Sequence, residues 1–468
     1  MKRILYILFW FSLVGVILLF SDCKKHKLNT DASAHLNFSQ DSILFDTIFT
    51  TVGSTTHRFK VYNPYNQPLN ISKIWLDQGI QSMFRINVDG ASGIEFEDLE
   101  ILPKDSLFVF AEVTIDPNNS TNPMVVEDKI HFLTNGNLQQ VVLTAWGQDA
   151  YFHNREIIST NTTWNNDKPH VIYDYCAIDS NITLTIPAGT NIYSHSSAML
   201  LIYKGSLQCN GTVSDLVTFQ QDRLEDFILS SPDSVQGQWR GIRFFGAQNS
   251  LVSHTYIKNA LIGIQIDTLQ ANQKVTLDAV QIHNCSYANL LTQGGNVDAV
   301  NCLFGNNATY SAFISIGGEV HFNFCTFGNY WSSSTRNTPL LAVKNYYKDN
   351  AENIYYRPFN QVTLNNSIIY GNNDNEFALD TLSRVMDGVN APNITISNCL
   401  IKTQDPVEGF PYTGNNYSNN DPDFQSPELW DFHISSTSFA KGKAGNSTIT
   451  ADLEGNARSN PSSLGCYE

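Results

Sequence analysis

Six short stretches of this chain repeat one pattern, and the repetition limits the possible folds more than any other feature of the sequence. Each stretch has an apolar residue at its first position and a bulky apolar residue five positions later, and four of the six have Asn two positions after that. The stretches begin at Val252, Leu277, Ala299, Phe322, Leu364 and Ile396. The first four starting points are 22 to 25 residues apart, and the next intervals are 42 and 32 residues. A period of this length suits one turn of a solenoid, with insertions in the longer turns.

The residue types of the repeat indicate strands. Short runs rich in Val, Ile, Phe and Thr are separated by Asn and Gly, and no stretch keeps the spacing of an amphipathic helix. A leucine-rich repeat has a similar period, but its Leu spacing and its helical half are missing. We therefore predict a parallel β-helix, in which the first and sixth repeat positions form buried ladders, each side chain contributing about 1.5–3 kcal/mol. Asn at the eighth position suits a tight corner in left-handed backbone.

Composition and charge narrow the class of protein. The 468 residues are enough for two or three domains, and 15% charged and 12% aromatic residues with 28 Gly fit an all-β, turn-rich extracytoplasmic protein. The net charge of −16 argues against nucleic acid or an anionic membrane surface as a partner. The same negative field opposes an acidic polysaccharide unless bound cations bridge the two.

The cysteines show a pattern of their own. Three of the eight, Cys302, Cys325 and Cys399, occupy the fourth repeat position, where other turns have Thr, Val or Ser. We expect a column of small buried side chains, because stacked rungs hold their Cβ atoms side by side, which suits a disulfide poorly. A metal or disulfide ladder is the alternative. A disulfide between Cys176 and either Cys209 or Cys285 is a further alternative.

The amino terminus has the layout of a signal peptide in residues 1–22. Lys2 and Arg3 precede an uncharged apolar run that ends at Phe20, and Cys23 follows. This resembles a bacterial lipobox, with Asp22 where the motif has Gly, Ala or Ser. The resemblance implies lipidation at Cys23, an outer-membrane anchor and a polar tether in residues 23–35. Basic residues follow Cys23, so the sequence does not decide between the periplasmic side and the cell-surface side of the outer membrane. The run also reaches the lower limit for a membrane span, so an uncleaved anchor is the alternative.

Residues 36–149 contain alternating strands without the 22–25-residue period. The clearest are Ser42–Phe45, His57–Tyr62, Leu107–Val113 and Val141–Ala145, with turns rich in Asn, Pro and Gly between them. Strands at this spacing predict a β-sandwich. The segment resembles the immunoglobulin-like domains at the front of Bacteroidota cell-envelope proteins.

The repeats and their flanks resemble a known family. Leu184–Ile192, Gly205–Thr212 and Trp239–Phe244 are similar to the opening turns of right-handed parallel β-helix proteins of the pectin-lyase-like superfamily. The resemblance implies a right-handed β-helix over residues 150–420. Residues 421–468 resemble the closing segment called choice-of-anchor Q, through Asp452–Arg458 and Leu464–Glu468. We expect this end to cap the last turn, because an open rung exposes unpaired strand edges.

Many β-helix proteins cleave polysaccharides, so an enzyme is the alternative function. A glycoside hydrolase needs paired carboxylates, and a polysaccharide lyase needs a base beside Ca²⁺ held by acidic residues. The polygalacturonase-type strings are missing from the repeat region. The densest charged cluster comprises Asp222, Arg223, Glu225, Asp226, Arg240 and Arg243. We expect it to be a solvated loop, so no catalytic residue or cofactor is assigned. Ca²⁺ is expected as a cofactor only if the protein is a lyase.

The insertion between Phe327 and Leu364 is the most attractive binding surface. It is rich in aromatic residues, and the candidate ligand-binding residues are Trp331, Tyr346, Tyr347, Tyr355 and Tyr356. Flat aromatic faces bind sugars and anchor protein partners, although the same rings could simply pack the insertion onto the solenoid. The sequence therefore favours a non-enzymatic, lipid-anchored outer-membrane protein that binds a polysaccharide or another envelope protein.

Overall fold

The computed structural model describes residues 27–117, 124–224, 235–382, 393–409 and 411–468. The chain divides into two units, Met1–Asp149 and Ala150–Glu468. The predicted signal peptide, residues 1–22, and the predicted lipidation site Cys23 lie outside the described residues. Within the described ranges, no helix has the length and apolar character needed to cross a membrane.

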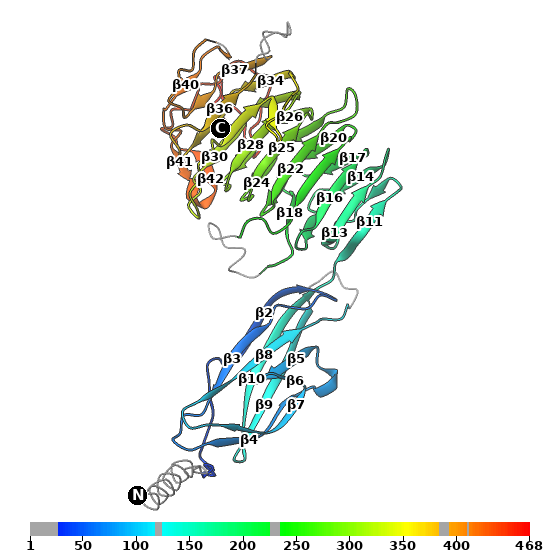
Figure 1. Cartoon of the computed structure of the whole chain (residues 1–468), viewed down its shortest axis with the longest axis vertical. Helices are drawn as coiled ribbons and strands as arrows, with labels where there is room; N and C mark the ends of the chain where they lie inside the picture. Colours follow the sequence, from blue (N-terminus) through cyan, green and yellow to red (C-terminus); the bar gives the residue numbers. More distant parts are fainter. Residues whose placement is uncertain (1–26, 118–123, 225–234, 383–392, 410) are drawn as a thin grey trace, which may run out of the picture. The chain divides into compact units, whose positions relative to one another are not determined.

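The first unit is an immunoglobulin-like β-sandwich of two five-stranded sheets (Figure 1). One sheet has the strand order β1 (Asn37–Phe38), β3 (His57–Tyr62), β8 (Ser106–Val113), β5 (Phe84–Val88) and β6 (Ala91–Gly93). The other has the order β2 (Ser42–Phe49), β10 (Asn137–Gln148), β9 (Met124–Thr134), β4 (Leu69–Leu76) and β7 (Glu95–Ile101). Strands alternate between buried and more exposed residues, as Leu107, Val109 and Ala111 show on β8. This alternation fills the space between the two sheets with apolar side chains.

The sandwich also holds the segment before its first strand. The Asn135 amide donates to the carbonyl of Asn29 at 2.9 Å, and the Asn137 amide donates to the carbonyl of Ala34 at 3.0 Å. Ala34 is only 1% exposed. The tether predicted for residues 23–35 is therefore wrong at its carboxyl end, because side-chain amides of the sandwich bind its backbone.

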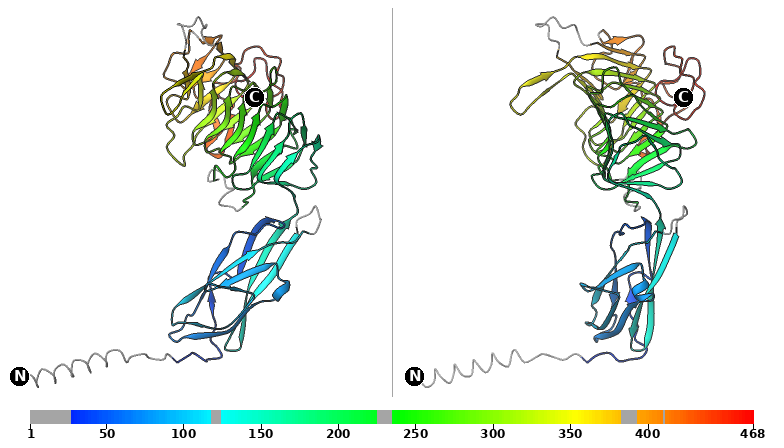
Figure 2. Two further views of the ribbon diagram at one scale, coloured as in Figure 1. Left: turned by 45° about the vertical axis from the view of Figure 1, so that its right-hand side comes forward. Right: turned by 90° about the vertical axis from the view of Figure 1, so that its right-hand side faces the viewer.

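The second unit is a parallel β-helix whose strands form three faces (Figures 1 and 2). The first face is a ten-stranded sheet: β12 (Thr162–Thr163), β14 (Thr183–Pro187), β17 (Ser206–Asn210), β20 (Ser250–Ser253), β23 (Val275–Asp278), β26 (Val297–Val300), β29 (Gly318–Asn323), β34 (Phe359–Asn365), β37 (Ile394–Ser397) and β39 (Tyr412–Thr413). Each of these strands pairs in parallel with the next.

The other two faces form one 18-stranded sheet that begins with β11 (Tyr151–Ile158) and β13 (His170–Ile178). The second face is β15 (Asn191–Ser194), β18 (Val217–Gln221), β21 (Thr255–Lys258), β24 (Gln281–His283), β27 (Leu303–Gly305), β30 (Thr326–Asn329), β35 (Ile368–Gly371), β38 (Leu400–Ile401) and β40 (Tyr417–Ser418). The third face is β16 (Met199–Tyr203), β19 (Gly241–Phe245), β22 (Ile262–Asp267), β25 (Ala288–Gln293), β28 (Tyr310–Ser315), β31 (Leu341–Lys344) and β36 (Phe377–Asp380).

The repeat builds the interior as predicted. Its first positions pair in register on the first face, from Val252 to Ile396. Its sixth positions pair in register on the second face, from Ile257 to Ile401. All twelve side chains are at most 1% exposed. The predicted ladders, and with them the parallel β-helix, are confirmed.

The corner and cysteine predictions can be compared residue by residue. Asn259, Asn284 and Asn306 have φ values of +62°, +55° and +24°, so three of the four asparagines at the eighth position turn in left-handed backbone. The seven described cysteines are all buried free thiols. Within the described part of the chain, the fourth-position column is therefore small buried side chains without disulfides, and Cys176 is bonded to neither proposed partner.

Residues 421–468, called here the carboxyl-terminal strap, lie along the side of the solenoid. The strap contains β41 (Phe424–Ser426), the 3-10 turn η3 (Pro427–Leu429) and β42 (Asp431–Ile434). Its apolar residues pack against outward residues of successive rungs, from Ala279 to Leu400. The strap thus caps the solenoid from the side, where a cap on the last turn was expected.

The reason for this path is visible at the seventh repeat position. A Cβ on Gly305 would lie 2.9 Å from the Phe432 ring, and a Cβ on Gly328 would lie 2.2 Å from it. The two glycines therefore leave the space that Phe432 fills.

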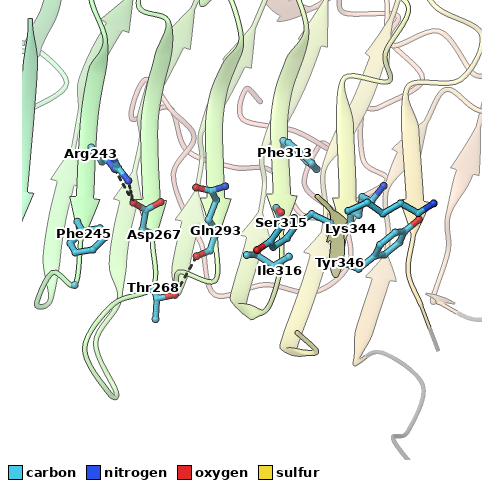
Figure 3. A pocket seen from close by; sticks show the side chains of 13 residues that line it. Arg243, Phe245, Asp267, Thr268, Gln293, Phe313, Ser315, Ile316, Lys344 and Tyr346 are labelled. Atoms are coloured by element: carbon cyan, nitrogen blue, oxygen red, sulfur yellow. Dashed lines mark hydrogen bonds and ion pairs between the residues drawn. The ribbon is translucent and has the colours of Figure 1, made fainter. Parts of the chain in front are cut away.

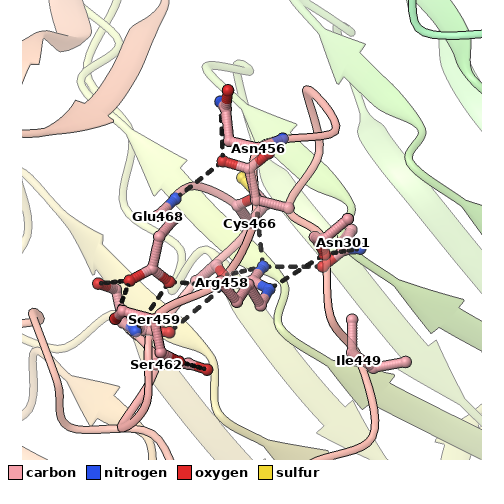
Figure 4. Close-up of polar contacts among 12 residues, drawn as sticks. Asn301, Ile449, Asn456, Arg458, Ser459, Ser462, Cys466 and Glu468 are labelled. Carbon is pink, nitrogen blue, oxygen red and sulfur yellow. Dashed lines mark hydrogen bonds and ion pairs between the residues drawn. The ribbon is translucent and has the colours of Figure 1, made fainter.

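The motif near the end of the chain closes the strap (Figure 4). One Asp452 oxygen accepts from the backbone N–H of Asn456 at 2.8 Å, and the other accepts from the backbone N–H of Glu468 at 3.0 Å. Arg458 donates to Asn301 Oδ1 at 2.8 Å, and its guanidinium lies 3.9 Å from the centroid of the Phe324 ring. These contacts give the motif a structural role.

Candidate functional site

The third face carries the candidate site, an open groove of about 930 Å³ (Figure 3). Side chains from β19, β22, β25, β28 and β31 form it, together with β32 (Tyr346–Lys348). β32 and β33 (Ile354–Tyr356) are the two strands of the insertion hairpin. Four steps separate β19 from β31, so the groove runs about 19 Å along the solenoid at about 4.8 Å per step. It is therefore long and shallow, with a shape suited to an extended ligand.

A row of polar side chains runs through the groove. Asp267, Gln293, Ser315 and Lys344 are register partners on successive strands, and Asp380 continues the row on β36. Side chains alternate along a strand, so the neighbouring residues, such as Ile266 and Ile314, point into the core. The rigid interior ladders thus fix the spacing of polar groups on the outside.

The charges at the two ends of this row are matched. Arg243 Nη2 lies 2.7 Å from Asp267 Oδ2, and Gln265 donates to the other Asp267 oxygen at 2.9 Å. Lys344 Nζ lies 3.0 Å from Asp380 Oδ2. Burial is the largest single influence and opposes both charged forms, but the Lys344–Asp380 hydrogen bond, the attraction between the two charges and the contacts with Tyr346 together outweigh it, so the pKa of Lys344 is raised and the pKa of Asp380 is lowered. The groove therefore offers hydrogen-bonding groups with little net charge.

Aromatic rings border the polar row. Phe245 is 43% exposed at the β19 end, and Phe313 lies on β28. At the other end the Tyr346 ring lies 4.3 Å from Lys344 Nζ, and its hydroxyl donates to Asp380 at 2.9 Å. Flat apolar surfaces thus stand beside oriented polar groups, as in many ligand sites.

Arg357 holds the hairpin beside the groove. Its backbone amide donates to Asn345 O at 3.0 Å, and its Nη1 donates to Thr268 Oγ1 at 2.7 Å. The guanidinium crosses two turns whose glycines, Gly294 and Gly317, both have φ of +78°. A Cβ at either position would lie 2.3–2.7 Å from Arg357 atoms, so only glycine lets the arginine lie there.

The structure separates the sequence-predicted residues into two groups. Tyr346 and Tyr347 line the groove, and Tyr355 stacks on Tyr347 with ring centroids 4.8 Å apart. Tyr356 lies opposite Tyr346 in the hairpin, which stands out from the solenoid (Figure 2). Trp331 is not brought to this surface: it is 8% exposed, and its Nε1 donates to Ser334 Oγ at 2.8 Å.

The polar row escaped the sequence analysis, although the sequence contains a signal for it. Each of its members ends a strand after an inward-pointing residue, as in Ile266-Asp267, Ile314-Ser315 and Val343-Lys344. This second repeat, on the third face, is less regular in spacing than the first because insertions interrupt it.

The charged cluster of the enzyme alternative does not assemble as a unit in the described residues. Asp222 accepts from His195 Nδ1 at 2.7 Å, and Arg243 belongs to the groove. Glu225 and Asp226 lie outside the described residues. Across the described ranges, the one group of three potential metal ligands is His153, Glu156 and Cys176.

Comparisons with known proteins identify no family. No family model matches the chain, and no curated protein matches it. Among solved structures, a family 123 glycoside hydrolase from Clostridium perfringens aligns at 7% identity over 26% of this chain and 31% of that chain, with a TM-score of 0.19. A protein of unknown function from Porphyromonas gingivalis W83 aligns at 9% identity over 27% of this chain and 60% of that chain, with a TM-score of 0.18. The chain thus spans less than a third of the hydrolase's length, and likeness at these scores carries no argument.

Proposed function

We propose that this protein is a non-enzymatic, lipid-anchored cell-envelope protein whose β-helix binds an extended, uncharged polysaccharide in the groove. The observation that carries the proposal is the row Asp267–Gln293–Ser315–Lys344 beside exposed aromatic rings. Sugars present hydroxyl groups at their edges and C–H surfaces on their faces, and the groove offers a partner for each. A regular step between rungs suits a polymer that repeats along its length.

The charge balance supports an uncharged ligand. Arg243 is paired with Asp267, and Lys344 is paired with Asp380, so neither cation is left to bind a uronic acid. The net charge of −16 adds a repulsive field toward acidic polymers. A neutral polysaccharide avoids both problems.

The spacing of carboxylates supports binding over hydrolysis at this groove. Asp267 and Asp380 are four register steps apart, about 19 Å at about 4.8 Å per step. Glycoside hydrolases need their two carboxyl groups about 5–9.5 Å apart. Arg243 and Gln265 also engage both oxygens of Asp267, which holds this carboxylate in place as a hydrogen-bond acceptor.

The envelope location rests on the amino terminus. The apolar run before Cys23 and the position of that cysteine support lipid anchoring to the outer membrane. The resemblance of residues 421–468 to choice-of-anchor Q segments of envelope proteins supports the same location.

The test is a binding screen with the full-length protein in detergent micelles. Neutral and acidic polysaccharides are immobilised, and retention is measured while reducing ends and unsaturated products are assayed in the same samples. We expect retention of a neutral polysaccharide without product. Phe313→Ala and Gln293→Ala should each weaken binding about tenfold, equivalent to about 1.4 kcal/mol.

Matched controls distinguish the groove from the rest of the surface. Gln281→Ala on β24 and Phe152→Ala on β11 change the same residue types outside the groove and should leave binding unchanged. Product formation would favour the lyase or hydrolase alternative. Absence of glycan binding, with capture of an envelope protein that depends on Phe313, would replace the polysaccharide with a protein ligand.

A further inference from the structure

A second cluster of reactive groups lies at the first rung of the solenoid, outside the groove. His153 and Glu156 are on β11, and Cys176 is on β13. One ligand atom from each of the three lies within 4.8 Å of the other two. His153 and Cys176 are buried, and the Glu156 side chain is 43% exposed. The cluster is therefore held by the core and open to solvent from one side.

An irregular stretch of backbone brings the three side chains together. His153 and Glu156 are three residues apart and would point to opposite sides of a regular strand. Between them the register shifts, because Arg155 alone on β11 lies opposite both Asp174 and Tyr175 on β13. Arg155 and Asp174 have φ of +51° and +61°, unfavourable backbone for residues other than glycine. Such irregularities often serve to re-aim a side chain at a functional site.

The hydrogen bonds of the cluster leave a place for a cation. His170 Nε2 lies 2.7 Å from the carbonyl oxygen of Asn165, so this nitrogen carries a proton and donates it. In neutral His170, Nδ1 is then the acceptor for His153 Nε2, at 2.8 Å. His153 Nδ1 is therefore a lone pair directed at Glu156 Oε2, another acceptor. Two acceptors in contact require a cation between them, either a proton or a metal ion.

The ring of Trp164 fixes both histidines. It stacks on His153 and His170 with centroid distances of 4.5 and 4.2 Å, and the two imidazole planes differ by 8°. The stack holds His153 in one orientation. His170 and Trp164 thus fix the orientation of His153, which lies on the first rung.

We propose that His153 Nδ1, the Glu156 carboxylate and the Cys176 thiolate bind Zn²⁺. Imidazole, carboxylate and thiolate are the three ligand types that Zn²⁺ takes, and the hydrogen bond from a ligand histidine to a second residue is the usual support. The thiolate selects Zn²⁺ over Ca²⁺ or Mg²⁺. Binding releases the Cys176 thiol proton and the proton held between His153 and Glu156 to solvent, and a water molecule completes four ligands.

The site would clamp the open end of the solenoid. In the sheet that the second and third faces share, β11 is the terminal strand and pairs with β13 alone. A metal that joins His153 and Glu156 to Cys176 adds a link between these two strands. Zn²⁺ is therefore expected to stabilise the first rung, independently of any ligand in the groove.

Cobalt substitution tests the site directly. The full-length protein is stripped with a chelator and titrated with Co²⁺, which gives a near-ultraviolet charge-transfer band when a thiolate binds it. We expect one equivalent of Co²⁺ with this band, displaced by Zn²⁺. Cys176→Ser should lose the band, whereas Cys209→Ser, which alters another fully buried thiol, should keep it. His170→Gln should weaken Co²⁺ binding about 10–100-fold through its hydrogen bond to His153.

Glu156→Gln covers the case in which Cys176→Ser does not fold, because Glu156 is partly exposed. It should retain the charge-transfer band and lower the affinity for Co²⁺ at least tenfold. A folded parent protein without the band would overturn the proposal and leave a shared proton as the cation between His153 and Glu156. The same band in Cys176→Ser, or unchanged affinity in Glu156→Gln, would overturn it as well.

Discussion

The second and third faces of the solenoid enclose the same core, but they differ in the side chains that point outward and in whether those side chains are covered. On the second face the outward row at the seventh repeat position includes His283, Gly305, Gly328 and Tyr370, and the strap buries it. On the third face the outward row is Asp267, Gln293, Ser315 and Lys344, and the groove stays open. Inward ladders therefore fix the fold, and one outward row on each face decides whether the chain covers that face itself.

The contrast extends to the aromatic residues. On the second face Phe432 is fully buried, and Trp430 stacks on His283 with centroids 5.5 Å apart. On the third face Phe245 is exposed beside paired charges. Burial of the rings on the second face therefore stabilises the fold, whereas the rings on the third face are available to a ligand.

The largest expected effect comes from removing a ring of the covered face. Phe432→Ala should lower the free energy of unfolding by about 3–5 kcal/mol, because it leaves a cavity over Gly305 and Gly328. Phe245→Ala on the open face should cost about 0.5 kcal/mol or less, since that ring is already in contact with water. Urea unfolding followed by tryptophan fluorescence measures both. Equal losses for the two variants would erase the distinction between the faces.

Adding a methyl group to the covered face should have the next largest effect. Gly328→Ala places its Cβ 2.2 Å from the Phe432 ring, so the strap must shift, at a cost of about 1–3 kcal/mol. Ala342→Val, on an outward position of β31, adds methyl groups next to the open groove and serves as the control. Limited proteolysis should cut the strap faster in Gly328→Ala alone. Unchanged proteolysis would mean that Phe432 moves without loosening the strap.

Sequence alone predicted the interior well because the interior is periodic. The ladders from Val252 and Ile257 recur every turn, so burial follows from the pattern. The strap could not be placed, because its contacts join Phe432 to glycines more than a hundred residues earlier. Nothing local to Gly328 distinguishes a docking position from a simple turn.

Only part of the candidate site could be predicted from the sequence, because the available signal was local composition. The density of aromatic residues pointed to Tyr346 and Tyr347, which line the groove. Trp331 shares that density but is buried beside Ser334, since composition does not say which rings a loop uses for its own packing. The polar row required the register of five strands, and the insertions that separate them hide its period.

The covered and open faces should also differ in their response to pH. Burial, together with the charge of Lys258, lowers the pKa of His283 to about 3. Its unfolded form binds protons below about pH 6.5, so stability is lost as pH falls from 6.5 toward 3, by about 1.4 kcal/mol at pH 5.5. His283→Gln should remove this loss, as measured by urea unfolding at pH 7 and pH 5.5. The same acid sensitivity in this variant would assign the effect to other groups.

His433 on β42 of the strap should act in the opposite direction. Burial disfavours its charged form, but Asp431 and Glu454, at 2.6 and 3.2 Å, outweigh burial and raise its pKa above 6.5. Its contribution is therefore complete below pH 6.5 and is lost as pH rises through the raised value. In the His283→Gln background, proteolysis of the strap should accelerate as pH rises above neutrality. Replacing His433 with Gln should flatten that dependence.

The smallest effect on stability is expected from the polar row itself. Lys344→Met removes the partner of Asp380, but the pair is partly exposed, so the free energy of unfolding should change by less than about 1 kcal/mol. The variant also leaves Asp380 as an acceptor without its cation, which makes this end of the groove more negative. Neutral-polysaccharide binding should weaken, and raising the salt concentration should restore little of it, because the loss is one of hydrogen bonding. A large loss of stability in Lys344→Met would show that the open row supports the fold as the covered row does, and the comparison between the two faces would fail.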